Sequence, residues 1–139
     1  MFIKVNDLKL YYEKSGSGQP ILLLHGNGED HRIFDKLIPK LAKTCTVYAI
    51  DSRGHGKSDR VPAYHYGEMA SDIAAFIRQL GLEKPWICGF SDGAILGLQP
   101  SAIRITETRS RYGSCSSRKV ISFSCFLMLC PEEAIDYVV

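Results

Sequence analysis

The sequence lacks the features of several protein classes. Its 139 residues contain no apolar run near the roughly 20 residues that a membrane-spanning helix needs. The longest run, Val120–Cys130, contains two serines. The formal net charge of +2 is too small to indicate a nucleic acid or another polyanion as a partner. We therefore expect neither a membrane span nor a nucleic-acid partner, and the remaining composition is that of a globular protein.

The cysteines argue against a fold held together by disulfides and against one built around a zinc ion. There are five of them, an odd number, with no Cys-x-x-Cys pattern and no cluster with histidine. The segment Met1–Asp7 has no basic stretch ahead of an apolar one, so no signal peptide is expected. These observations predict free thiols in a reducing compartment and a cytoplasmic location, with no disulfide framework and no zinc site.

Two parts of unlike composition meet near Leu98. Eleven of the twelve glycines and eight of the nine lysines lie at or before this residue. The 41 residues that follow hold seven of the thirteen serines and show no sustained hydrophobic period. We therefore divide the chain into a domain over residues 1–98 and an atypical tail over residues 99–139.

Strand and helix patterns alternate through the first part. An antiparallel pair is expected at Met1–Val5 and Leu8–Lys14. Short apolar runs predict buried strands at Ile21–His25, Thr46–Ile50 and Pro85–Cys88. Helical spacing predicts helices at Asp30–Ala42 and Tyr66–Leu80 and a third one starting at Ala94. This order predicts an α/β fold with a mostly parallel sheet and helices on both faces.

The sharpest motif is Gly89-Phe90-Ser91-Asp92-Gly93, which matches Gly-x-Ser-x-Gly between a predicted strand and a predicted helix. In that context it indicates a nucleophile elbow, a tight turn that exposes a serine hydroxyl at the carboxyl end of the sheet. Side chains two residues either side of the serine would collide, which explains Gly89 and Gly93. Without that context the same pattern arises by chance in glycine-bearing loops.

A second glycine-rich turn, His25-Gly26-Asn27-Gly28, follows the first buried strand. Backbone N–H groups of Asn27 and Asp92 would then face the same sheet edge and form an oxyanion hole. The plainer alternative is an ordinary turn between a strand and a helix. We expect His25 and Gly26 to be structural members of this motif, and His25 not to act as a base.

The loop Asp51–Ser58 ends in Gly56-Lys57-Ser58, like a phosphate-binding Walker A loop. That loop requires a glycine five positions before Gly56, and the sequence has Asp51 there. An anion at this position favours a charged loop beside the site over nucleotide binding.

Taken together, the three motifs resemble the N-terminal half of the α/β-hydrolase fold family in order and spacing, over about residues 1–98. The resemblance implies a sheet that stops after the nucleophile-elbow helix. It implies that Ser91 is the nucleophile, that Asn27 and Asp92 donate backbone N–H groups, and that no metal or organic cofactor is used. It also implies a hydrolase of the serine type that acts on a small-molecule ester, amide or related carbonyl substrate.

The family's remaining catalytic groups have no counterpart in the sequence. In this fold the acid and the histidine follow the serine, whereas His25, His31, His55 and His65 all precede Ser91. The alternative function is therefore a catalytically inactive fragment or pseudoenzyme. For the tail we consider disorder or a frameshift near Leu98, because a shifted reading of chosen codons there gives Arg-Tyr-Pro-Asp, a typical family continuation. Unless the tail supplies a further strand, the last central strand keeps an unpaired edge, which predicts self-association.

Overall fold

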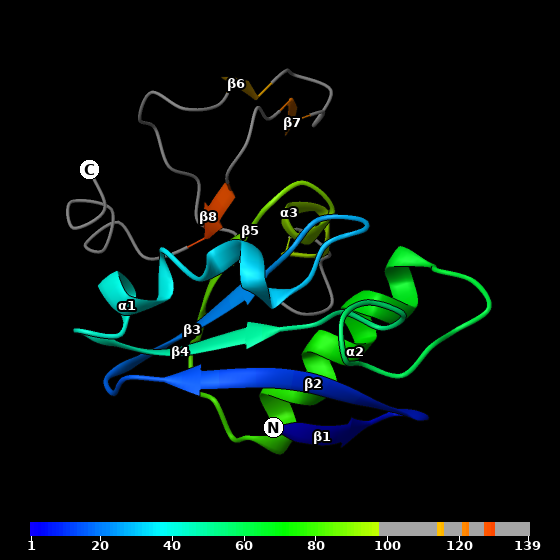
Figure 1. Ribbon diagram of the computed structural model, residues 1–139. Helices are drawn as coiled ribbons and strands as arrows, with labels where there is room; N and C mark the ends of the chain where they lie inside the picture. The colour runs from blue at the N-terminus through cyan, green and yellow to red at the C-terminus, as the bar shows by residue number, and fades with distance from the viewer. Residues whose placement is uncertain (98–113, 116–120, 123–126, 130–139) are drawn as a thin grey trace.

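The structure, a computed structural model, describes residues 1–97, 114–115, 121–122 and 127–129. Six strands form one sheet in the order β1-β2-β4-β3-β5-β8 (Figure 1). Their bounds are β1 Phe2–Val5, β2 Leu8–Ser15, β3 Gln19–Leu24, β4 Cys45–Ile50, β5 Trp86–Gly89 and β8 Leu127–Leu129. A separate pair consists of β6 Ser114–Cys115 and β7 Ile121–Ser122.

The sheet is parallel at its centre and antiparallel on both sides. Strand β3 pairs in parallel with β4 and with β5, while β2 pairs antiparallel with β4 and with β1. The helices are η1 His31–Phe34, α1 Ile38–Leu41, α2 Tyr66–Gln79 and α3 Asp92–Gly97. The predicted α/β class is therefore confirmed, with a mixed sheet and parallel strands confined to its middle.

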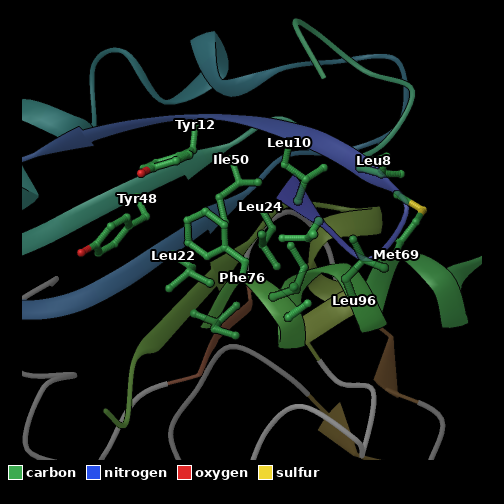
Figure 2. Close-up of a cluster of buried hydrophobic side chains, with 14 residues drawn as sticks. Leu8, Leu10, Tyr12, Leu22, Leu24, Tyr48, Ile50, Met69, Phe76 and Leu96 are labelled. Atoms are coloured by element: carbon green, nitrogen blue, oxygen red, sulfur yellow. The ribbon is translucent and has the colours of Figure 1, made fainter. Parts of the chain in front are cut away.

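Both faces of the central strands are buried, as their unbroken apolar sequences predict. Along β3, Leu22 and Leu24 pack on the face that α2 and α3 cover, around Phe76 (Figure 2). Ile21 and Leu23 point to the other face, which η1 and α1 cover. Because both faces are filled, the polar residues at the carboxyl ends of these strands are the groups left to form a site.

One predicted helix is wrong. In place of a helix over residues 30–42, the chain forms η1 and the four-residue α1. Asp30 does cap the first of these, since its carboxylate accepts the Arg32 N–H at 2.9 Å. Pro39 explains the break, because it has no N–H to continue a helical ladder from the preceding turn and is tolerated only in the first turn of a helix, where it lies in α1.

The outer edge of β5 is paired in this structure. Strand β8 runs antiparallel along it, from Ile87 opposite Leu129 to Gly89 opposite Leu127. Self-association through that edge stays a prediction. The disorder and frameshift expected for the tail concern residues that lie mostly outside those described.

The structure also bears on the predictions about a membrane span and about disulfides. Among the described residues, no helix is both long and apolar enough to cross a lipid bilayer. Cys45 and Cys88 are not part of a disulfide, and both are buried in the face of the sheet that η1 and α1 cover.

Candidate active site

Ser91 occupies the turn between β5 and α3 and is exposed. Its φ is +52°, a left-handed conformation that a residue with a β-carbon rarely adopts. Glycine is required on both sides of it. A β-carbon on Gly89 would overlap the backbone of Gly93, and one on Gly93 would overlap the backbone of Leu24. The turn is tied to the sheet because the Phe90 N–H donates to the Leu24 carbonyl at 2.9 Å.

The second predicted turn lies directly beside this serine. A β-carbon on Gly26 would be 3.2 Å from the Ser91 Cβ, so the two turns are in contact. His25 and Gly26 are buried, whereas Asn27 and Gly28 are exposed. Asp92, the first residue of α3, is half-buried. The structure thus gathers the predicted residues at the carboxyl ends of β3 and β5.

His25 holds the second turn in shape. Its Nε2 accepts the Ser52 N–H at 3.0 Å, so its proton lies on Nδ1, which donates to the Gly26 carbonyl at 2.7 Å. Burial lowers the pKa of His25 below its ordinary value, which favours this neutral form. Because both ring nitrogens have backbone partners, His25 is not available as a base for Ser91.

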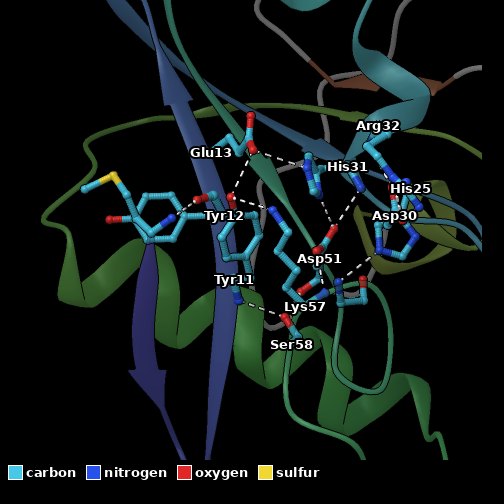
Figure 3. Close-up of polar contacts among 12 residues, drawn as sticks. Tyr11, Tyr12, Glu13, His25, Asp30, His31, Arg32, Asp51, Lys57 and Ser58 are labelled. Atoms are coloured by element: carbon cyan, nitrogen blue, oxygen red, sulfur yellow. Dashed lines mark hydrogen bonds and ion pairs between the residues drawn. The ribbon is translucent and has the colours of Figure 1, made fainter.

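Two other histidines also have partners. His31 is buried with Nδ1 at 2.8 Å from Asp51 Oδ1 and Nε2 at 3.3 Å from Glu13 Oε1 (Figure 3). His55 Nδ1 lies 2.9 Å from the Arg53 carbonyl, and its Nε2 lies 3.4 Å from Asn27 Oδ1. His65 is exposed and precedes α2. No histidine in the described part of the chain therefore stands out as a partner of Ser91.

Asp51 fills the loop that resembles a phosphate-binding motif. Its carboxylate is fully buried and accepts the N–H groups of His31 at 2.7 Å and Lys57 at 2.9 Å (Figure 3). A β-carbon on Gly56 would overlap this carboxylate. Because an anion of the protein already occupies the loop, the nucleotide-binding alternative has no phosphate cradle here.

Arg53 anchors the same loop to α2. It is buried and forms two hydrogen bonds with the buried carboxylate of Asp72, at 2.6 and 2.9 Å. A third contact joins its Nη1 to Glu68 at 2.9 Å. The hydrogen bond to Asp72 raises the pKa of Arg53, so the guanidinium stays charged. This network fixes the loop against the helix that packs behind the site.

Three side chains have the chemistry of a metal site. Ligand atoms of Asp30, His31 and Asp51 lie within 4.8 Å of one another. However, the guanidinium of Arg32 forms a chelated pair with the Asp30 carboxylate, with contacts of 2.6 to 3.1 Å. This pairing holds the pKa of Asp30 well below its usual range. A cation would have to displace that guanidinium, so we assign no metal site to this cluster.

Sequence reasoning missed one residue of this region, Glu29. Its Oε2 accepts the Gly26 N–H at 3.1 Å. The available signal was its position three residues after Gly26, the spacing at which a carboxylate returns to a backbone N–H in a capping box.

Two family models match the sequence. One, described as alpha/beta hydrolase fold, matches residues 19–103. The other, described as YgjP-like, metallopeptidase domain, matches residues 92–139, so the two overlap at α3 and just beyond it.

Individual hydrolases match more than half of the chain. The AB hydrolase superfamily protein YisY of Bacillus subtilis is 36% identical over 101 residues, which are 70% of this chain and 38% of that protein. The esterase EaEST of Exiguobacterium antarcticum has a TM-score of 0.59 and 38% identity, covering 62% of this chain and 33% of the esterase.

An epoxide hydrolase of Vigna radiata, VrEH1, has a TM-score of 0.69 and 26% identity over 76% of this chain and 37% of that structure. The chain thus spans between 33% and 38% of the length of these relatives. Since the hydrolase family model covers more than half of the sequence and the fold agrees with it, the chain belongs to the α/β-hydrolase family.

Proposed function

We propose that the chain carries the nucleophile and oxyanion region of a serine-type hydrolase that acts on an ester, an amide or a related carbonyl substrate. The observation that carries this proposal is the backbone of Ser91. A left-handed φ of +52° at an exposed serine between β5 and α3 is costly and persists only where the surroundings enforce it. The surroundings here are close backbone contacts, since Gly89 lies against Gly93 and Gly93 lies against Leu24, so that a β-carbon on either glycine would overlap its neighbour.

The chemistry follows from the neighbours of this serine. The Ser91 Oγ gives its proton to a base and attacks the carbonyl carbon, and the bond to the alcohol or amine of the substrate breaks as that group takes up the proton and leaves. Water then hydrolyses the acyl-serine, which releases the carboxylic acid and restores the serine hydroxyl. Negative charge develops on the carbonyl oxygen, and the N–H groups of Asn27 and Asp92 are the donors proposed to stabilise it. A neutral His25 supports this arrangement by holding the Gly26 carbonyl.

A base is the missing component. A serine hydroxyl is a weak nucleophile without one, and no histidine of this sequence follows Ser91. His25, His31 and His55 have their ring nitrogens in contacts that support the fold. We therefore propose none of these three histidines as the base that takes the proton of Ser91. The relatives include an esterase and an epoxide hydrolase, so we propose a substrate class and no single substrate.

Covalent labelling tests the nucleophile directly. The purified chain is treated with a fluorophosphonate probe, with and without added imidazole as a soluble base, and the modified residue is located by peptide mass spectrometry. We expect labelling at Ser91, faster with imidazole, and none in Ser91→Ala. Ser17→Ala, an exposed serine before β3, serves as the matched control.

Two results would contradict the proposal. Labelling that persists in Ser91→Ala would place the nucleophile elsewhere. A wild-type chain that stays unlabelled in imidazole would favour the catalytically inactive fragment.

A further inference from the structure

A carboxylate lies inside the turn that joins β3 to η1. Glu29 is half-buried, and its Oε2 accepts the N–H of the buried Gly26 at 3.1 Å. The Glu29 N–H in turn donates to the Gly26 carbonyl at 3.4 Å. Glu29 therefore forms hydrogen bonds with Gly26 through both its side chain and its backbone.

These contacts decide how the next peptide bond is oriented. The Gly26 carbonyl and the Asn27 N–H belong to one planar, trans peptide, so they point in opposite directions. His25 Nδ1 and the Glu29 N–H hold the carbonyl on one side. The Asn27 N–H must then point to the other side, and the carboxylate bond to the Gly26 N–H stops the preceding peptide from rotating.

The same carboxylate is close to the nucleophile. A β-carbon on Gly26 would be 2.8 Å from Glu29 Oε2, 3.2 Å from the Ser91 Cβ and 3.3 Å from a ring carbon of Phe90. Glu29 and Ser91 thus both lie beside the position that a β-carbon on residue 26 would take, and a larger residue there would have to displace the Glu29 carboxylate. A movement of the Glu29 side chain would therefore disturb the contact between the turn that contains Gly26 and the turn that contains Ser91.

We infer that Glu29 is a positioning residue for the oxyanion donor: its carboxylate holds the Gly26 N–H and thereby directs the Asn27 N–H toward the site of Ser91. This inference rests on the proposed function. Glu29 acts through Gly26 and touches no substrate. The required property is an acceptor oxygen at this position, and a charge-assisted bond of this kind is stronger than a neutral one.

Two substitutions distinguish the loss of the acceptor oxygen from a loss of the fold. Glu29→Ala removes the acceptor oxygen, whereas Glu29→Gln keeps an acceptor oxygen on a side chain of the same length. Glu83→Ala is the matched control, because Glu83 is exposed in the loop before β5, at the opposite edge of the sheet. Fluorescence of Trp86, the single tryptophan, monitors unfolding of each variant so that loss of the fold is recognised.

The first readout needs no activity. Amide hydrogen exchange and 15N–1H chemical shifts are measured by NMR for Gly26 and Asn27. We expect Glu29→Ala to speed exchange at Gly26 and to move the Asn27 resonance, Glu29→Gln to restore most of both, and Glu83→Ala to change neither.

The second readout is the rate at which the fluorophosphonate probe labels Ser91 in imidazole. We expect Glu29→Ala to lower this rate about tenfold, a modest share of the effect of deleting an oxyanion donor outright. Glu29→Gln should recover most of the wild-type rate.

A folded Glu29→Ala chain with a wild-type labelling rate, or with unchanged Gly26 and Asn27 amides, would overturn the inference. Should the wild type itself stay unlabelled, the proposed function fails, and the amide data alone then decide whether Glu29 directs the Asn27 N–H.

Discussion

Gly93 lies against Leu24 so closely that a β-carbon on residue 93 would overlap the Leu24 carbonyl. This contact seats the first turn of α3 directly on the end of β3. Ser91, in the turn between β5 and α3, is tied to this helix because the Ala94 and Ile95 N–H groups donate to its carbonyl at 2.9 and 3.3 Å. The position of the serine is therefore set by backbone packing.

Substitution of Gly93 tests that packing. Gly93→Ala should lower the free energy of unfolding by about 3 kcal/mol or more, since the overlap is with backbone that cannot move aside cheaply. Gly67→Ala is the control, because a β-carbon there meets nothing within 4 Å in α2. Gly67 is the second residue of α2, so its replacement should stabilise the chain by less than the roughly 0.5–1 kcal/mol expected for a glycine in the middle of a helix. Urea unfolding followed by Trp86 fluorescence measures both, and equal effects would refute the packing argument.

The buried pair of Arg53 and Asp72 gives a second prediction. Arg53→Ala leaves the Asp72 carboxylate buried without its cation and should cost about 3–5 kcal/mol of stability. Combining it with Asp72→Ala should cost less than the sum of the two single changes, because neither charge is then stranded. Arg32→Ala is the control for an exposed pair and should change stability little. Additive effects of the two single changes would mean that Arg53 and Asp72 do not act as a pair.

Burial of His25 predicts a dependence of stability on pH. Its pKa in the folded chain is lower than its ordinary value of 6.5, chiefly because burial disfavours the imidazolium. The unfolded chain therefore binds more protons as the pH falls below 6.5, and the free energy of unfolding should decrease there. His25→Gln should show a shallower decrease over the same range in urea unfolding at a series of pH values. Parallel curves for the wild type and the variant would contradict this assignment.

Hydrolysis of p-nitrophenyl acetate gives a fourth prediction. Loss of the histidine in a serine hydrolase costs on the order of a million-fold in turnover, so the 139-residue chain alone should be nearly as slow as Ser91→Ala. Added imidazole should raise the wild-type rate above that of Ser91→Ala in the same buffer. A wild-type rate about a hundred-fold or more above the variant without imidazole would show that a base in this chain reaches Ser91, since a positioned base contributes about 10²–10⁴-fold.

The tail has two competing origins that the gene can separate. A frameshift near Leu98 predicts that another reading frame encodes a hydrolase-like continuation, with Arg-Tyr-Pro-Asp at its start. The match of residues 92–139 to a second family predicts instead that the present frame is the meaningful one. The nucleotide sequence from Leu98 onward distinguishes these outcomes, and a hydrolase-like continuation in no frame would exclude the frameshift.

The elements and their order were predictable because each depends on a local pattern. Unbroken apolar runs indicate strands buried on both faces, and the helix at Tyr66–Gln79 ends one residue before its predicted end. The helix expected over residues 30–42 does not form for an equally local reason, since Pro39 interrupts the helical hydrogen bonds despite a good amphipathic period.

The sequence by itself determined the fold class, the family and the residues that gather at the carboxyl edge of the sheet, because strand order and motif spacing place them there. Only the tertiary structure decided which partners each of those residues contacts. In the structure, both ring nitrogens of His25 are hydrogen-bonded to backbone groups. The Asp51 carboxylate accepts a backbone N–H of the loop that contains Gly56, and the Glu29 carboxylate accepts the Gly26 N–H. Such contacts depend on the distances and directions of individual atoms, which residue spacing along the chain does not specify.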